Sequence, residues 1–196
     1  MKILITGSSG FLGKALSYQL SENGLDFIKV TRQNIKGSTI VANYKETPDA
    51  DIIIHLAQSN DRHFVNSQNS SYIKENLEIV DYLIKKTHKK FIYISSASVY
   101  GDKIKTPRKT IEKIEPYDIY SHIKLESENI VLKKNGTILR LSNIYGPEMS
   151  KKNILSNIIE KVSSEKVIKV NNGYTIRDFI WVGDVIEAII KVIKLE

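Results

Sequence analysis

The stretch Lys2-Ile3-Leu4-Ile5-Thr6-Gly7-Ser8-Ser9-Gly10-Phe11-Leu12-Gly13 decides the fold of this chain. A short apolar run leads into three glycines, and apolar residues then recur at helical intervals as far as Asn23-Gly24. A strand, a glycine-rich loop and a helix in this order are typical of a dinucleotide site, whose pyrophosphate rests against the helix N-terminus. We expect Gly7 to allow the tight turn, Gly10 to let the backbone approach phosphate, and Gly13 to let the helix pack closely on the sheet.

Length and composition place the chain among ordinary globular proteins. Its 196 residues are 41% hydrophobic and 26% charged, enough for one large domain with a core. No apolar run approaches the length of a membrane span, and the first apolar run stops at Thr6, which favours a strand over a signal peptide. Cysteine is absent, which excludes disulfides and thiolate metal sites and agrees with a cytoplasmic protein.

The chain is basic, with a formal charge of +7 and a pI of about 9.3, so nucleic acid must be considered as a partner. The lysines occur in scattered pairs such as Lys85-Lys86 and Lys133-Lys134, near the ends of expected helices. Such cations complement the helix dipole and stay solvated. We therefore predict a lysine-rich surface and no nucleic-acid site. The four histidines lack metal-ligand spacing, so no metal site is expected.

Strand and helix patterns alternate along the chain, which predicts an α/β fold with a doubly wound parallel sheet. Polar residues 59–71 have the composition of a ligand loop beyond a strand end. We predict one domain over residues 1–147 and a small second lobe over residues 148–196. The expected strands are Ile3–Thr6, Phe27–Thr31, Thr39–Ala42, Asp51–Ala57, Lys90–Ser95, Thr137–Ser142 and Val167–Val170; the expected helices are Phe11–Asn23, Asn69–His88, Pro116–Lys134, Lys152–Ser163 and one from Val182 onward.

Tyr120 and Lys124 stand four residues apart in one expected helix and therefore share a face. An ammonium so close to a phenol is expected to lower the tyrosine pKa and to make it a proton acceptor and donor. Alone, the pair is as consistent with chance as with chemistry. Ser96 follows an expected strand and adds a hydroxyl at the same sheet edge, which makes the combination far more specific.

These motifs together resemble the extended short-chain dehydrogenase/reductases, the NAD(P)-dependent sugar-nucleotide epimerase/dehydratase family, and within it the UDP-galactose 4-epimerase group. The resemblance implies a Rossmann-type fold and runs almost the whole length of the chain. It rests on Thr6-Gly7-x-x-Gly10-Phe11-Leu12-Gly13, Asp51-x-x-x-His55-Leu56-Ala57, Asn76, Ser96 before Tyr100, Tyr120 with Lys124, Arg140-Leu141-x-Asn143-x-Tyr145-Gly146-Pro147 and Arg177-Asp178-Phe179-x-x-Val182-x-Asp184-Val185.

The resemblance implies that Tyr120 takes a proton from a sugar hydroxyl while hydride passes to or from nicotinamide. Ser96 would hold the sugar oxygen, Lys124 the nicotinamide ribose, and Asn76 the local hydrogen-bond network. Asn143 and Arg177 would bind the nucleotide diphosphate, with local capping as an equally supported alternative for both. The implied cofactor-binding set is Gly7, Gly10, Phe11, Leu12, Gly13, Arg32, Asn43, Leu56, Ala57, Tyr120 and Lys124.

Departures from the family pattern narrow the expectation. Ala97-Ser98 stand where the 4,6-dehydratases carry an acidic pair, which disfavours dehydration and leaves an epimerase or a reductase. Arg32 follows the second strand, where NAD enzymes carry an acid, and this favours NADP, with NAD as the alternative.

The chain stops soon after the Arg-Asp-Phe signature, so we expect either a truncated chain or a naturally short member of the family whose sugar pocket is incomplete. A nucleotide sugar is the expected substrate and a homodimer the expected assembly. The rival hypothesis from another class is a non-catalytic dinucleotide-binding module.

Overall fold

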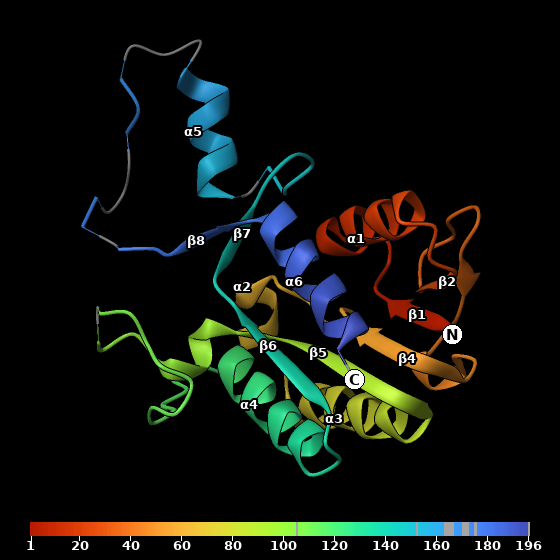
Figure 1. Ribbon diagram of the computed structural model, residues 1–196. Coiled ribbons are helices and arrows are strands. Elements are labelled where there is room, and N and C mark those ends of the chain that lie inside the picture. Colours follow the sequence, from red (N-terminus) through yellow and green to blue (C-terminus); the bar gives the residue numbers. More distant parts are fainter. Residues whose placement is uncertain (105, 152, 163–166, 170–172, 175, 196) are drawn as a thin grey trace.

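A computed structural model describes residues 1–196 except residues 105, 152, 163–166, 170–172, 175 and 196. The described chain forms a six-stranded parallel sheet in the order β3-β2-β1-β4-β5-β6 and a two-stranded parallel sheet of β7 and β8 (Figure 1). This order reverses direction between β1 and β4, as in the doubly wound Rossmann fold. The predicted fold class is thus confirmed.

The elements of the large sheet are β1 (Ile3–Thr6), β2 (Phe27–Thr31), β3 (Thr39–Ile40), β4 (Ala50–His55), β5 (Thr87–Ser96) and β6 (Thr137–Leu141); those of the small sheet are β7 (Asn143–Tyr145) and β8 (Phe179–Trp181). The helices are α1 (Phe11–Glu22), α2 (Arg62–Asn66), α3 (Ser70–Lys85), α4 (Ile119–Leu132), α5 (Ile154–Val162) and α6 (Val182–Lys194), with single 3-10 turns η1 (Tyr44–Glu46) and η2 (Ala97–Tyr100).

Successive side chains of β1 point to opposite faces of the sheet, and both faces are covered by helices. Ile3 and Ile5 belong to one core cluster with residues of α1 and α6, whereas Leu4 belongs to a second with residues of α3 and α4. All three side chains are fully buried. A strand buried on both faces is apolar throughout, which is why its sequence shows no alternation.

Helix α6 lies against α1 on one face of the large sheet (Figure 1). Val185, Ile189 and Ile193 of this helix are buried in the same cluster as β1. The division of the chain after residue 147 remains a prediction, but this last helix packs on the Rossmann sheet rather than on a separate lobe.

Several predicted boundaries were wrong. The loop predicted over residues 59–71 contains α2, and the helix predicted to run through His88 ends at Lys85 because β5 begins at Thr87. Strands β7 and β8 were not predicted. Of the strand predicted over Val167–Val170, residues 167–169 have no strand structure and Val170 lies outside the described residues.

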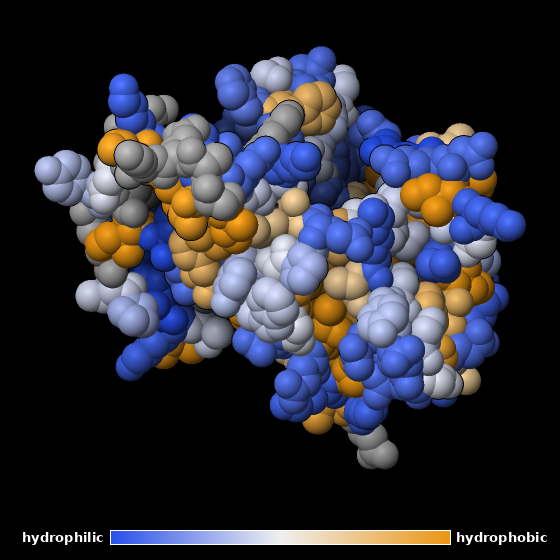
Figure 2. Space-filling model, turned by 90° about the horizontal axis from the view of Figure 1, so that it is seen from above, coloured by the Kyte–Doolittle hydropathy of each residue, from blue (hydrophilic) through white to orange (hydrophobic). Residues whose placement is uncertain are grey.

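Among the described residues, no helix has both the length and the apolar character needed to cross a membrane. Seen from above, hydrophilic surface is interrupted by separate apolar patches (Figure 2). Helix α5 has no fully buried residue, and Ile159 and Val162 on it are about two thirds exposed.

Candidate active site

The glycine loop joins β1 to α1 at the point where the strand order reverses. Gly7 has φ +68°, and a Cβ on it would lie 2.8 Å from the Cα of Ala57. A Cβ on Gly13 would lie 2.3 Å from the carbonyl oxygen of Gly7, whereas one on Gly10 would meet that oxygen only at 3.4 Å. The first and third glycines are therefore required by the fold, and the second leaves open space at the loop.

The loop's other predicted cofactor residues are held by the core. The side chains of Phe11 and Leu12 pack against the core cluster on the α1 face, so their backbones form the first turn of the helix. The Leu56 amide donates to Thr6 at 3.3 Å, which ties the end of β4 to the end of β1. Two adjacent strand ends thus lie beside the helix N-terminus, where a phosphate group can be bound.

Gln58 lies just beyond β4, and sequence reasoning did not single it out. Its Oε1 accepts a hydrogen bond from the Tyr93 hydroxyl at 3.0 Å, while its buried Nε2 has no partner among the described residues. Buried amide donors are nearly always satisfied, so this donor fits a site that a polar ligand completes. Together with the glycine cradle it fits a bound dinucleotide.

Arg32 and Asn43 border the other end of this cradle. The Arg32 guanidinium lies over the ring of Tyr44, 5.5 Å from its centroid, and burial raises the pKa of that phenol although the nearby guanidinium lowers it. The Asn43 side chain accepts from the Lys45 amide at 2.9 Å and caps η1. Asn43 therefore has a local structural role in the ligand-free protein.

Tyr120, Ser96 and Lys124 come together at the carboxyl ends of β5 and β4. The Ser96 hydroxyl is a hydrogen-bond partner of the Tyr120 phenol, and the Lys124 Nζ lies 5.8 Å from the centroid of the Tyr120 ring. Ser96 also accepts from the Ser98 amide at 3.2 Å, which fixes its hydroxyl at the start of η2. The predicted helical spacing thus gives the predicted shared face.

The expected lowering of the tyrosine pKa is not found in this state. Burial raises the pKa of Tyr120, and the hydrogen bond to Ser96 lowers it only in part. Burial also lowers the pKa of Lys124 to about 7, although the charge of Glu128 raises it. The Lys124 ammonium donates a hydrogen bond to the Ile94 carbonyl at 2.8 Å, which fixes its position beside β5.

Helix α2 is attached to the start of α4, where Tyr120 lies. Arg62 donates to the Tyr117 hydroxyl at 2.7 Å and pairs with Asp118, and its guanidinium lies 5.4 Å from the Tyr120 ring centroid. Asn66 accepts from the Tyr120 amide at 3.0 Å and donates to Asp118 at 3.0 Å. Burial raises the pKa of Asp118, but hydrogen bonds from Ser121, Arg62 and Asn66 outweigh it and hold the pKa below its usual range.

A buried ion pair lies under the same helix. Glu128 receives hydrogen bonds from Arg140 at 2.6 and 3.0 Å and a further one from Ser95, the residue before Ser96. Arg140 also donates to the Tyr100 hydroxyl at 2.7 Å. The hydrogen bonds to Glu128 raise the pKa of Arg140 although burial lowers it, so the guanidinium stays charged.

The remaining predicted residues lie apart from these three side chains. Asn76 donates to the Tyr72 carbonyl within its own helix at 2.8 Å, and the Tyr72 phenol is a further partner. Asn143 donates to the Asp178 carbonyl at 2.9 Å and so joins β7 to the segment before β8. Arg177 is exposed beside that link. The observed contact of Asn76 is thus local to its own helix, whereas Asn143 joins two segments that are 35 residues apart.

The family profile described as "NAD dependent epimerase/dehydratase family" matches residues 3–196. The chain belongs to this family. It is 27% identical to "dTDP-D-glucose 4,6-dehydratase" of Dictyostelium discoideum, with 95% of this chain and 54% of that protein aligned, so it spans about half the length of that relative.

Two solved structures show the same fold as this family member. "MoeE5 in complex with UDP-glucuronic acid and NAD" matches with a TM-score of 0.86 at 22% identity, covering all of this chain and 73% of the other. UDP-glucose 4-epimerase from Thermotoga maritima, solved with UDP-glucose, matches with a TM-score of 0.83 at 23% identity, covering 99% and 74%.

Three residues of this site, Arg62, Gln58 and Glu128, were not predicted from the sequence. Glu128 had a readable signal, because Tyr120, Lys124 and Glu128 continue one helical stripe in steps of four. Arg62 lacked one, since its partner Asp118 is distant in sequence. No cluster of three or more potential metal ligands occurs among the residues that the structure describes.

Proposed function

We propose that the protein is an NAD(P)-dependent oxidoreductase or epimerase that acts on a nucleotide sugar. The observation that supports this most is the convergence of Ser96, Tyr120 and Lys124 at the edge of the sheet that also carries the glycine cradle. The similar dehydratase is named for a nucleotide sugar, and the two similar solved structures contain one, which supports the proposal.

In this proposal a bound nicotinamide accepts or supplies the hydride. Tyr120 takes the proton of the sugar hydroxyl during oxidation and returns it during reduction. Ser96 donates a hydrogen bond to the same oxygen, for which its place beside the phenol is suited. Lys124 carries the positive charge that stabilises phenolate, and its pKa of about 7 makes that charge decline above neutral pH.

We propose epimerisation or reduction rather than dehydration. Elimination of water needs a positioned acid, and η2 offers Ala97 and Ser98 directly after Ser96. We also propose NADP as the preferred cofactor, because the end of β2 carries Thr31 and Arg32 and no carboxylate that would repel a 2′-phosphate. Asn143 and Arg177 are proposed to bind the diphosphate of the substrate.

We propose a homodimer assembled through α3 and α4 and a cytoplasmic location. The two helices pack side by side on one face of the sheet (Figure 1), and Tyr117 and Leu132 at the ends of the α4 region are more than half exposed. Sedimentation that gives only a monomer at micromolar concentration contradicts the assembly.

The test is Tyr120→Phe, with Tyr117→Phe as the matched control on the same helix start. Nucleotide sugars are screened with each dinucleotide, and turnover is followed by reduced cofactor and by product sugar. We expect Tyr120→Phe to bind the dinucleotide but to lose at least about a hundredfold in kcat, and Tyr117→Phe to retain activity. Unchanged turnover in Tyr120→Phe refutes the mechanism. Dinucleotide binding without turnover of any sugar by the native chain supports a non-catalytic binding module.

A further inference from the structure

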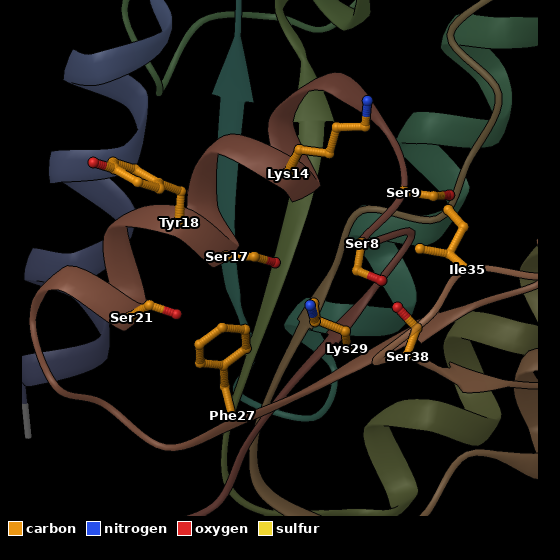
Figure 3. Close-up of a pocket in the computed structure, with 10 residues that line it drawn as sticks. All are labelled: Ser8, Ser9, Lys14, Ser17, Tyr18, Ser21, Phe27, Lys29, Ile35 and Ser38. Atoms are coloured by element: carbon orange, nitrogen blue, oxygen red, sulfur yellow. The ribbon is translucent and has the colours of Figure 1, made fainter.

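A cavity of about 270 Å³ lies on the outer side of the glycine loop, between α1, β2 and the turn at residues 33–38 (Figure 3). Its lining is rich in hydroxyls and cations and includes no aspartate or glutamate. Ser17 and Lys29 point into the space between helix and strand, whereas Tyr18 points away from it (Figure 3). The lining of the cavity includes Ser8, Ser9, Lys14, Ser17 and Lys29.

Lys29 is the central charge of this cavity. It is half-buried, and its ammonium has neither a carboxylate nor a hydrogen-bond acceptor among the described residues. The turn above it is close, because a Cβ on Gly37 would lie 3.8 Å from Nζ. Burial of a lysine without a partner is costly, so an uncompensated, half-buried ammonium in a hydroxyl-lined cavity is suited to bind an anion.

The hydroxyls divide into those already used and those free to donate. Ser8 donates to the Val30 carbonyl and Ser17 to the Gly13 carbonyl. Ser9 instead accepts from the Thr31 hydroxyl at 3.0 Å, which leaves its own proton available. The Ser9 proton and the Lys29 ammonium are thus two free donors in the same cavity.

The cavity adjoins the end of β2, where a doubly wound fold places the adenosine ribose of its cofactor. Lys29 and Thr31 point to the same face of the strand, two residues or about 6.6 Å apart. The extended stem of a lysine is long enough to cover a similar distance, and Lys29 and Ser9 line the same cavity, whose Ser9 hydroxyl meets Thr31 at the strand end. Arg32 points to the opposite face and lies over Tyr44.

We propose that this cavity binds a phosphate monoester, the 2′-phosphate of NADP, with Lys29 and Ser9 as its ligands. The inference rests on the proposed dinucleotide function and gives the cofactor preference to Lys29 rather than to Arg32. Lys14 contributes less, because its ammonium already pairs with Glu148 at 3.3 Å in exposed surroundings.

The experiment compares NADPH and NADH binding, measured by reduced-nicotinamide fluorescence, in wild type, Lys29→Met, Lys29→Arg and Arg32→Met. Lys36→Met, an exposed lysine of the same turn, is the matched control. We expect Lys29→Met to weaken NADPH roughly tenfold to a hundredfold, the range for a lost charge-assisted contact, and to leave NADH unchanged. Lys29→Arg restores NADPH binding, and Lys36→Met changes neither cofactor.

Competition by 2′,5′-ADP, 5′-AMP and inorganic phosphate identifies the source of the phosphate. Stronger competition by 2′,5′-ADP than by 5′-AMP, lost in Lys29→Met, supports the proposal. Lys29-dependent binding of inorganic phosphate alone overturns the assignment to the cofactor. Equal weakening of NADH and NADPH in Lys29→Met overturns it too, because it shows a structural role. If neither dinucleotide binds to wild type, the proposed function itself fails; NADH binding without a Lys29-dependent preference refutes only this inference.

Discussion

His55 at the end of β4 should make the stability of this protein fall as the pH drops below 7. Its ring is 3% exposed and is stacked on Phe91 and Tyr93 with centroids 6.2 and 6.0 Å away. The Thr6 hydroxyl lies 2.7 Å from Nδ1 and is its hydrogen-bond partner, and it also accepts from the Leu56 amide. Burial and, to a smaller extent, the charge of Lys124 lower the pKa of His55 to about 3.

The sign and size of the effect follow from this pKa. The unfolded chain binds the proton near pH 6.5 and the native protein only near pH 3, so acid favours the unfolded state. The contribution of His55 to stability is complete above about pH 7 and is lost as the pH falls toward 3. Integrating from pH 7 to pH 5 gives a loss of about 2 kcal/mol in the free energy of unfolding from this residue.

The assay is urea unfolding at pH 7 and pH 5, followed by the fluorescence of the single tryptophan, Trp181, and by circular dichroism. His55→Asn keeps an acceptor for the Thr6 hydroxyl but cannot be protonated. It lowers stability at both pH values, and the fall between them should be about 2 kcal/mol smaller than in wild type. His122→Asn, on the exposed side of α4, should retain the full fall. The reasoning is refuted if His55→Asn shows the same pH dependence as wild type.

Three further predictions test the site. Gly10→Ala should weaken dinucleotide binding and leave the thermal midpoint within a few degrees of wild type, whereas Gly13→Ala should lower both, because its Cβ meets backbone at 2.3 Å; equal midpoints in calorimetry contradict this contrast. Glu128→Gln should cost about 3 to 5 kcal/mol in urea unfolding, since it leaves an arginine whose side chain is only 16% exposed without its anion, and a loss under 1 kcal/mol shows that the pair is dispensable. Arg62→Met should raise the pKa of Tyr120, whose phenolate the guanidinium favours; an unchanged Tyr120-dependent absorbance titration at 295 nm opposes this.

Much of the fold could be predicted because local patterns and tertiary structure agree in it. The first strand, the glycine loop and α1 are specified by one continuous stretch, and a doubly wound sheet follows from the alternation of strands and helices. Strands β7 and β8 could not be read, since each has three residues and their pairing joins Asn143 to Phe179 across a long separation. Helix α2 has five residues in a polar run, too short for periodicity to show.

The end of α3 shows how tertiary pairing overrides local preference. Residues 86–88 continue a helical pattern in the sequence, yet Thr87 pairs with Ala50 of β4 and begins β5. Hydrogen bonds to the neighbouring strand replace the helical hydrogen bonds that these residues would otherwise make. Their helix propensity is too weak to prevent this. No local pattern specifies where the partner strand lies.

The parts of the candidate site that share one helix could be predicted from the sequence, whereas contacts between distant segments could not. Tyr120 and Lys124 could be paired from spacing alone, but the sign of the tyrosine pKa shift depends on burial, which spacing does not give. Arg62 reaches Tyr120 only because α2 packs on the start of α4. The electrostatics of the site are therefore a property of the packed fold.

One face of α4 carries residues that determine both the charges of the candidate site and the stability of the fold. Tyr120, Lys124 and Glu128 follow one another at intervals of one turn, so the proposed proton acceptor, a lysine with a pKa of about 7 and the buried anion are held by the same backbone. Glu128 raises the pKa of Lys124 while it also binds Arg140 and Ser95. Without the charge of Glu128, burial would lower the pKa of Lys124 further. A substitution that removes this charge should therefore reduce both the stability of the fold and the fraction of Lys124 that is protonated at neutral pH.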